Sequence, residues 1–216
     1  MGMEATLEQI TPQQLAEFIE HPKKAYDYWL AEALDNPNLE PFLEQLSARL
    51  KTLPPGFREQ VEAVMGRMYS KMQERKGLQL GKKEPEPQPE RKRFSLEKDW
   101  HVVHYVLNGT ADGGEGPLAD AVLGGEHIPD EEGVSDFGGL RYLTPPRVVA
   151  VARALAEVDP NQLLSRLDRQ EAEAKHIYLA HTLPDGWDYL PELFLDFRAF
   201  YEDAARSGNV MLLSIS

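Results

Sequence analysis

The sequence predicts an α+β protein: a mostly helical single domain with a small sheet, for which both chain termini are candidate strands. Three observations predict this class. Apolar residues recur at helical spacing along most of the chain, residues 3–10 alternate weakly between apolar and polar, and residues 210–216 are almost continuously apolar. A continuous apolar run of this length is typical of a buried strand.

In the first third of the chain, the spacing of apolar residues predicts helices separated by prolines. The first helix is expected to begin after Thr11, because Thr11 can cap it, Pro12 suits the first helical position and Gln14 completes a capping box. Further helices are predicted by the same spacing over residues 25–33, 39–52 and 57–72.

The composition then changes over residues 77–93, where three prolines alternate with charged and polar residues. Residues 71–98 hold nine Lys and Arg against five Asp and Glu, a local net charge of +4. We interpret 77–93 as a flexible, basic, proline-rich loop within a single domain that spans residues 1–216.

The next apolar stretch includes the motif WHVVHYVLNG and predicts a central helix over residues 96–107, with Ser95 as its N-cap. This helix is apolar on nearly every side, and Asn108-Gly109 is a typical helix end. Beyond it, Gly124-Gly125 stops a short apolar segment. The remaining predicted elements are a strand at 140–143, helices from Thr144 to Val158, over 161–175 and over 190–204, and a strand at 210–216.

Several segments together resemble the YfbM-like family of bacterial proteins, domain of unknown function 1877. They occur in the family's order and are MGM, DWHVVHYVLNG, GPLADAVLGGEHI, LRYLTPPRVVAVARAL and YLPELFLDFRAFYEDAARSGNVMLLSIS. The sequence departs from the family pattern at SDFGGLRYL and in the insertion at 77–93. The resemblance implies a single cytoplasmic α+β domain without an established activity, cofactor or partner, and it supplies no catalytic residue.

Composition excludes several classes of function. The formal net charge is −13, which argues against nucleic acid as a partner because phosphate binding needs clustered Lys and Arg. The chain has no cysteine, so disulfides and thiol chemistry are excluded, and no apolar run is long enough for a membrane span. The sequence therefore predicts a soluble cytoplasmic protein that does not bind membranes, with an oligomeric state left open.

Six residues are candidates for a pocket between the 96–107 helix and the 117–142 segment. His101 and His104 lie three residues apart, so both imidazoles can lie on one helix face, and Arg141 can clamp an anion. No metal-site motif accompanies the histidines, and we predict neither a metal nor another cofactor. The full candidate set is Trp100, His101, His104, Glu126, Arg141 and Tyr142.

Two functional hypotheses follow. The first is a protein-interaction module without catalysis that binds a protein partner, with an immunity- or antitoxin-like role as a special case. It rests on the acidic charge and on the lack of a catalytic motif. The alternative is a small-molecule-binding protein or enzyme that uses the pocket just described, with a histidine as acid or base.

Overall fold

The computed structural model describes residues 3–35, 39–50, 58–59, 62, 65–66, 68–70, 73, 91–129, 139–183 and 185–215. The chain divides into two compact units. The first combines Met1–Lys23 with Arg91–Ser216, and the second is Lys24–Glu90. The predicted 77–93 loop lies outside the described residues as far as residue 90.

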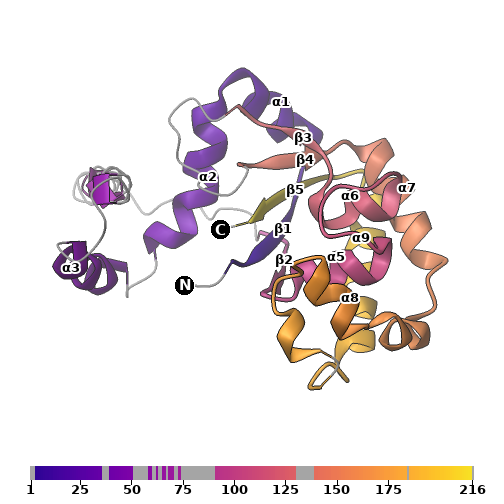
Figure 1. Ribbon diagram of the computed structural model, residues 1–216. Helices are drawn as coiled ribbons and strands as arrows, with labels where there is room; N and C mark the ends of the chain where they lie inside the picture. The colour runs from indigo at the N-terminus through magenta and orange to yellow at the C-terminus, as the bar shows by residue number, and fades with distance from the viewer. Residues whose placement is uncertain are drawn as a thin grey trace. The chain divides into compact units, whose positions relative to one another are not determined.

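The first unit is built on a five-stranded antiparallel sheet in the order β2-β1-β5-β4-β3. The N-terminal strand β1 lies beside the C-terminal strand β5, with Ala5 opposite Ile215 and Ile10 opposite Val210 (Figure 1). This confirms the predicted fold class, a mostly helical α+β chain whose sheet includes strands from both ends. The strands are β1 (Ala5–Ile10), β2 (Arg93–Glu97), β3 (Glu126–His127), β4 (Arg141–Leu143) and β5 (Val210–Ile215).

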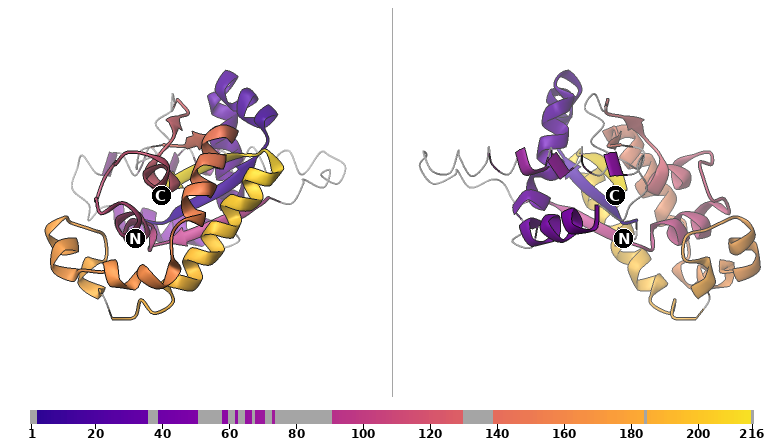
Figure 2. Two further views of the ribbon diagram at one scale, coloured as in Figure 1. Left: turned by 90° about the vertical axis from the view of Figure 1, so that its right-hand side faces the viewer. Right: turned by 60° about the vertical axis from the view of Figure 1, so that its left-hand side comes forward.

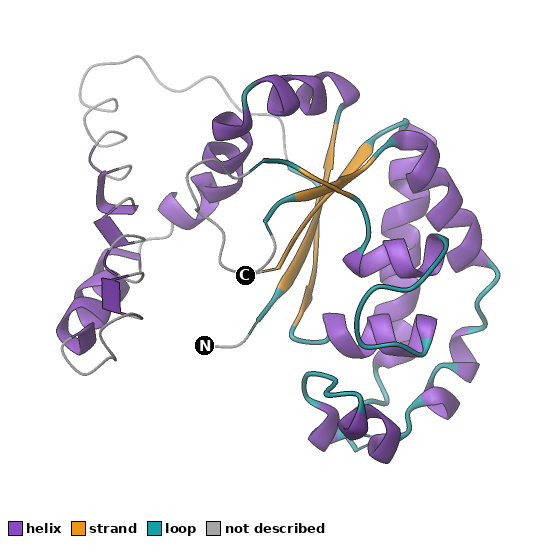
Figure 3. Cartoon of the chain, turned by 45° about the horizontal axis from the view of Figure 1, so that its top comes forward, coloured by secondary structure: helices purple, strands orange, loops and turns teal. Residues whose placement is uncertain are grey.

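Helices cover one face of this sheet and form the main core (Figure 3). The strands supply Leu7, Leu143, Met211 and Leu213, which alternate with residues that face the other way. The long helix α9 lies beside α7 across this face (Figure 2, left). The helices on this side are α5 (Trp100–Asn108), α6 (Pro117–Leu123), α7 (Pro145–Ala156), α8 (Arg169–Ala174) and α9 (Leu190–Ser207).

Local signals set several helix ends as predicted. In α1 (Pro12–Glu20), the Thr11 side chain accepts from the Gln14 backbone N–H, and the Gln14 side chain accepts from the Thr11 backbone N–H. Both halves of the capping box are therefore formed. Helix α9 ends at Gly208, whose φ of 65° is a left-handed conformation that glycine adopts without a Cβ clash.

The predicted start of the 96–107 helix is wrong. Residues 93–97 form strand β2 and the helix α5 begins only at Trp100, with Asp99 rather than Ser95 at the N-cap position. Phe94 lies opposite Leu7 of β1, so pairing with a strand near the start of the chain determines the structure of this segment.

The predicted helix over 161–175 is also wrong, because the segment is divided into three pieces. Two short 3-10 helices, Pro160–Gln162 and Leu164–Arg166, precede α8. Leu167 is extended, and Asp168 then starts α8 by accepting a hydrogen bond from the Glu171 backbone N–H at 2.9 Å. A side chain that caps a new helix competes with continuation of the old one.

The second unit is helical wherever it is described. It contains most of α2 (Pro22–Asp35) and all of α3 (Leu39–Arg49), and the described residues between 58 and 73 are also helical. Its buried side chains include Tyr26, Leu43 and Met65. The helices predicted at 25–33 and 39–52 therefore form, with α3 ending at Arg49.

Candidate functional site

Trp100 and His101 begin α5 and connect it to three other backbone positions, at Met3, Ala111 and Tyr178. The Trp100 indole donates to the Met3 carbonyl at 3.2 Å, and its ring stacks on that of His101 at 4.6 Å. The His101 Nδ1 accepts from the Tyr178 backbone N–H at 2.9 Å, so its Nε2 carries the hydrogen that it donates to the Ala111 carbonyl at 2.8 Å. Both imidazole nitrogens are occupied, and burial lowers the pKa of His101. This histidine holds loops together as a neutral ring.

His104 lies one turn further along α5 and is fully buried. Burial is the main cause, and the neighbouring His101 a smaller one, of the lowering of its pKa from 6.5 to about 4, so the ring is neutral at physiological pH. Its Nδ1 lies 3.3 Å from the Asn108 side-chain nitrogen. The Gly113 backbone lies close enough to hydrogen-bond the ring, and this contact raises the pKa against the effect of burial.

Arg141 lies on the helix-facing side of β4, the side that it shares with Leu143. Its guanidinium donates through Nη1 to the Leu123 carbonyl at the end of α6. Gly125 lies between the end of α6 and β3, where the chain turns. Its φ is +105°, and a Cβ there would lie 2.6 Å from the Tyr142 carbonyl oxygen, so this turn needs glycine. Burial lowers the pKa of Arg141.

Glu126 and Tyr142 are paired on the opposite side of the sheet from Arg141. Glu126 of β3 lies opposite Tyr142 of β4, and the Tyr142 hydroxyl donates to the Glu126 carboxylate at 2.8 Å. Because neighbouring strand residues point to opposite faces, Tyr142 cannot share a site with Arg141. The six candidates thus do not converge on one site: Trp100 stacks on His101, Glu126 pairs with Tyr142, and Arg141 binds the Leu123 carbonyl.

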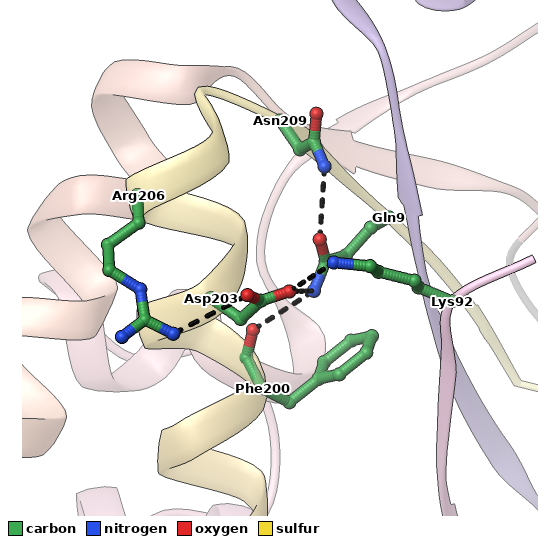
Figure 4. Close-up of polar contacts among 6 residues, drawn as sticks. All are labelled: Gln9, Lys92, Phe200, Asp203, Arg206 and Asn209. Carbon is green, nitrogen blue, oxygen red and sulfur yellow. Dashed lines mark hydrogen bonds and ion pairs between the residues drawn. The ribbon is translucent and has the colours of Figure 1, made fainter.

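A polar cluster that the sequence did not reveal joins β1, the approach to β2 and the end of α9 (Figure 4). Asp203 accepts from Lys92 at 2.7 Å and from the Gln9 side chain at 3.2 Å, and these bonds lower its pKa. Gln9 in turn accepts from the Asn209 side chain at 3.0 Å. Arg206 lies on the other side of Asp203, at 3.4 Å.

Glu8 is the centre of a second polar group and is almost fully buried, at 2% exposure. Arg91 binds both of its carboxylate oxygens, at 2.6 and 2.8 Å, and Arg93 adds a third contact at 2.8 Å. The sequence signal was present, because a glutamate within an alternating strand and an Arg-Lys-Arg run have complementary charges. Glu8 lies more than eighty residues from Arg91 and Arg93, so the sequence alone does not show that they pair.

Comparison with known proteins identifies the family. The profile described as "Domain of unknown function (DUF1877)" matches residues 1–214. The chain belongs to this family. Among solved structures, the DUF1877 chain is similar to the crystal structure of a protein of unknown function, YfbM from Escherichia coli, with 17% sequence identity, 99% of each chain covered and a TM-score of 0.52. At this identity the likeness shows the fold alone. No curated protein matches the chain.

One surface of the described DUF1877 chain combines exposed apolar side chains with several carboxylates, and we call it the α9 acidic face. It covers the turn before α9 and the first two turns of that helix. Tyr189 and Leu195 are 42% and 40% exposed, and with Ile19 and Leu164 they are the large apolar side chains that lie exposed in the described chain. The face consists of Asp185, Asp188, Tyr189, Glu192, Leu195 and Asp196.

Two further classes of site were sought in the described ranges. There, no three His, Asp or Glu side chains lie close enough to one another to hold a metal ion. No helix in these same ranges combines the length and the apolar character needed to cross a bilayer. Among the described surfaces, the α9 acidic face is therefore the candidate that the geometry favours.

Proposed function

We propose that this DUF1877 protein is a cytoplasmic, non-catalytic interaction module whose α9 acidic face binds a Lys- and Arg-rich surface of another protein. The observation that carries the proposal is the exposure of Tyr189 and Leu195 beside carboxylates that pair with no cation among the described residues. Exposed aromatic and aliphatic side chains surrounded by charge are typical of interaction surfaces. The absence of cysteine fits a reducing compartment.

The two halves of α9 differ in whether their acidic side chains form ion pairs. In the C-terminal half, Glu202 pairs with Arg198 at 3.6 Å, and Asp203 pairs with Lys92 and Arg206. In the N-terminal half, no cation of the described chain pairs with Glu192 or Asp196. The unpaired acids are therefore concentrated where the apolar side chains are exposed.

Helix stability explains only part of this arrangement. A carboxylate in the first turn interacts favourably with the helix dipole, which accounts for Glu192. The dipole effect fades beyond that turn, so it gives no reason for Asp196, and it gives none for an exposed Leu195. A basic partner accounts for all three, because its charges neutralise the acids while its aliphatic stems cover the apolar side chains.

The test compares two variants with the same change in charge. Each is immobilised beside the wild type, and proteins bound from a cell extract are quantified at low and moderate salt. The face variant carries Asp188→Asn, Glu192→Gln and Asp196→Asn, and the control carries Glu115→Gln, Glu157→Gln and Glu173→Gln.

The proposal expects one basic protein that binds to the wild type and the control, is lost from the face variant, and is released as salt rises. A partner retained equally by both variants contradicts the proposal. So does a bound protein without a basic surface, or the absence of any protein enriched on the wild type.

A further inference from the structure

Tyr189 is an exposed aromatic residue whose side chain is nevertheless held on two sides. Its hydroxyl donates to the Asp99 carboxylate at 2.8 Å, and its ring stacks on that of Trp187 at 5.6 Å, with 22° between the ring planes. Trp187 is itself buried, and its indole donates to the Thr182 hydroxyl at 3.1 Å. The orientation of the Tyr189 ring is therefore restrained although 42% of the residue is exposed.

The outer face of the Tyr189 ring, which we define as the face turned away from Trp187, makes no ring or cation contact within the described chain. Because Trp187 lies against one face, the exposed area belongs to the outer face and to the ring edge. Elsewhere the chain does place a cation over an aromatic ring, since the Lys175 ammonium lies 5.5 Å from the centre of the Tyr105 ring. Covering Trp187 gives a structural role to one face of Tyr189 and none to the outer face.

The groups around Tyr189 are negatively charged. Asp99 contacts its hydroxyl, Asp188 precedes it in the chain and Glu192 lies in the first turn of α9. None of these three carboxylates pairs with a cation of the described residues. The dipole of α9 disfavours a cation at this end of the helix, and the carboxylates offset that effect. Burial and the hydrogen bond to Asp99 raise the pKa of Tyr189, so the phenol is neutral.

We infer that the outer face of Tyr189 binds an arginine side chain of the basic partner, with the guanidinium stacked on the ring. The inference rests on the proposed function and specifies which basic residue the α9 acidic face selects. A cation over an aromatic ring is attracted by the negative face of the ring quadrupole. A planar guanidinium stacks on such a face and still donates at its edge to a carboxylate, whereas the lysine ammonium is compact and strongly hydrated. A restrained ring also loses little conformational entropy when it is bound.

The experiment compares the binding of two peptides of equal charge to the full-length protein. They are acetyl-Lys-Lys-Arg-Lys-Lys-amide and its counterpart with lysine in place of arginine. Dissociation constants come from the backbone amide resonances of residues 188–196 in nitrogen-15-labelled protein. The side-chain protons of the peptide arginine report stacking directly, because the ring current of an aromatic face shifts them upfield.

Three substitutions and one multiple variant separate the ring from the charges. Tyr189→Leu removes the ring and keeps an apolar side chain, while Tyr189→Phe keeps the ring and removes the hydroxyl. Tyr178→Leu is the matched control, because Tyr178 also stacks on a tryptophan, at 6.5 Å from Trp100, but lies outside the α9 acidic face. The face variant removes three carboxylates and keeps the Tyr189 ring.

We expect the wild type to bind the arginine peptide about two- to fivefold more tightly than the lysine peptide, which is the factor that an exposed cation–π contact supplies. Tyr189→Leu should abolish this preference and the upfield shift, while Tyr189→Phe and Tyr178→Leu keep both. The face variant should bind both peptides more weakly and keep the ratio of their affinities.

Equal affinity of the wild type for the two peptides overturns the inference, and so does a preference that Tyr189→Leu retains. Both results leave the proposed function in place, because the α9 acidic face still binds a basic peptide. Binding of neither peptide contradicts the proposed function and the inference together. The comparison of the two peptides on the wild type decides the question even if a variant does not fold.

Discussion

Acid should destabilise this protein through His104, and the size of the effect follows from its burial. The pKa of His104 is about 4 in the folded chain and 6.5 when the ring is solvated. Below pH 6.5 the unfolded chain binds a proton that the folded chain does not. The free energy of unfolding therefore decreases as the pH is lowered from 6.5 to about 4, and above pH 6.5 His104 has little effect on it. The full loss is about 3 kcal/mol, of which about 2 kcal/mol appears between about pH 7.5 and about pH 5.

The assay is urea denaturation at these two pH values, followed by the fluorescence of Trp100 and Trp187, which are buried in the same unit as His104. His104→Gln should lose most of the difference between the two pH values. His181→Gln, an exposed histidine, should keep it. If wild type and His104→Gln lose the same free energy of unfolding, the reasoning from burial is refuted.

Three further substitutions test the packing of the first unit, each by its free energy of unfolding in urea. Glu8→Gln should cost about 3 kcal/mol, because it leaves two arginines with a neutral partner, and a cost under about 1 kcal/mol would mean that water already solvates them. Gly125→Ala should cost more than about 2 kcal/mol because of its positive φ and its approach to the Tyr142 carbonyl, and a neutral result would contradict that turn geometry. Tyr201→Phe should cost about 1–2 kcal/mol, since the Ala121 carbonyl loses a buried donor at 2.8 Å, and unchanged stability would place another donor there.

Features decided by neighbouring residues could be predicted from the sequence. The capping box at Thr11 and the end of α9 at Gly208 each depend on a few residues in a row, and both are formed. Strand β2 could not be found in this way, because Phe94 becomes part of a strand only by pairing with Leu7. A short segment between a loop and a helix carries too little periodicity to reveal such a partner.

The prediction of site residues from the sequence was limited in the same way, and it contained one error that the sequence itself could have prevented. Spacing placed His101 and His104 close together, but only the fold shows that backbone groups bind both nitrogens of the first and that the second is fully buried. The error concerns Arg141 and Tyr142, which were placed in one pocket although they are adjacent in a predicted strand. Alternation alone assigns them to opposite faces of the sheet.

The position of β1 in the sheet has a consequence for how the chain is made. This strand leaves the ribosome before the rest of the sheet, and one of its two neighbours, β5, begins only at Val210. At a synthesis rate of about 5–20 residues per second, the backbone hydrogen-bonding groups along one edge of β1 stay unpaired for at least about ten seconds. The other neighbour, β2, is also synthesised well after β1. Contacts this distant in sequence slow folding and expose the early strand to unwanted association. The nascent chain is therefore most vulnerable to aggregation before β5 emerges, and a chaperone that shields residues near Leu7 would act in that interval.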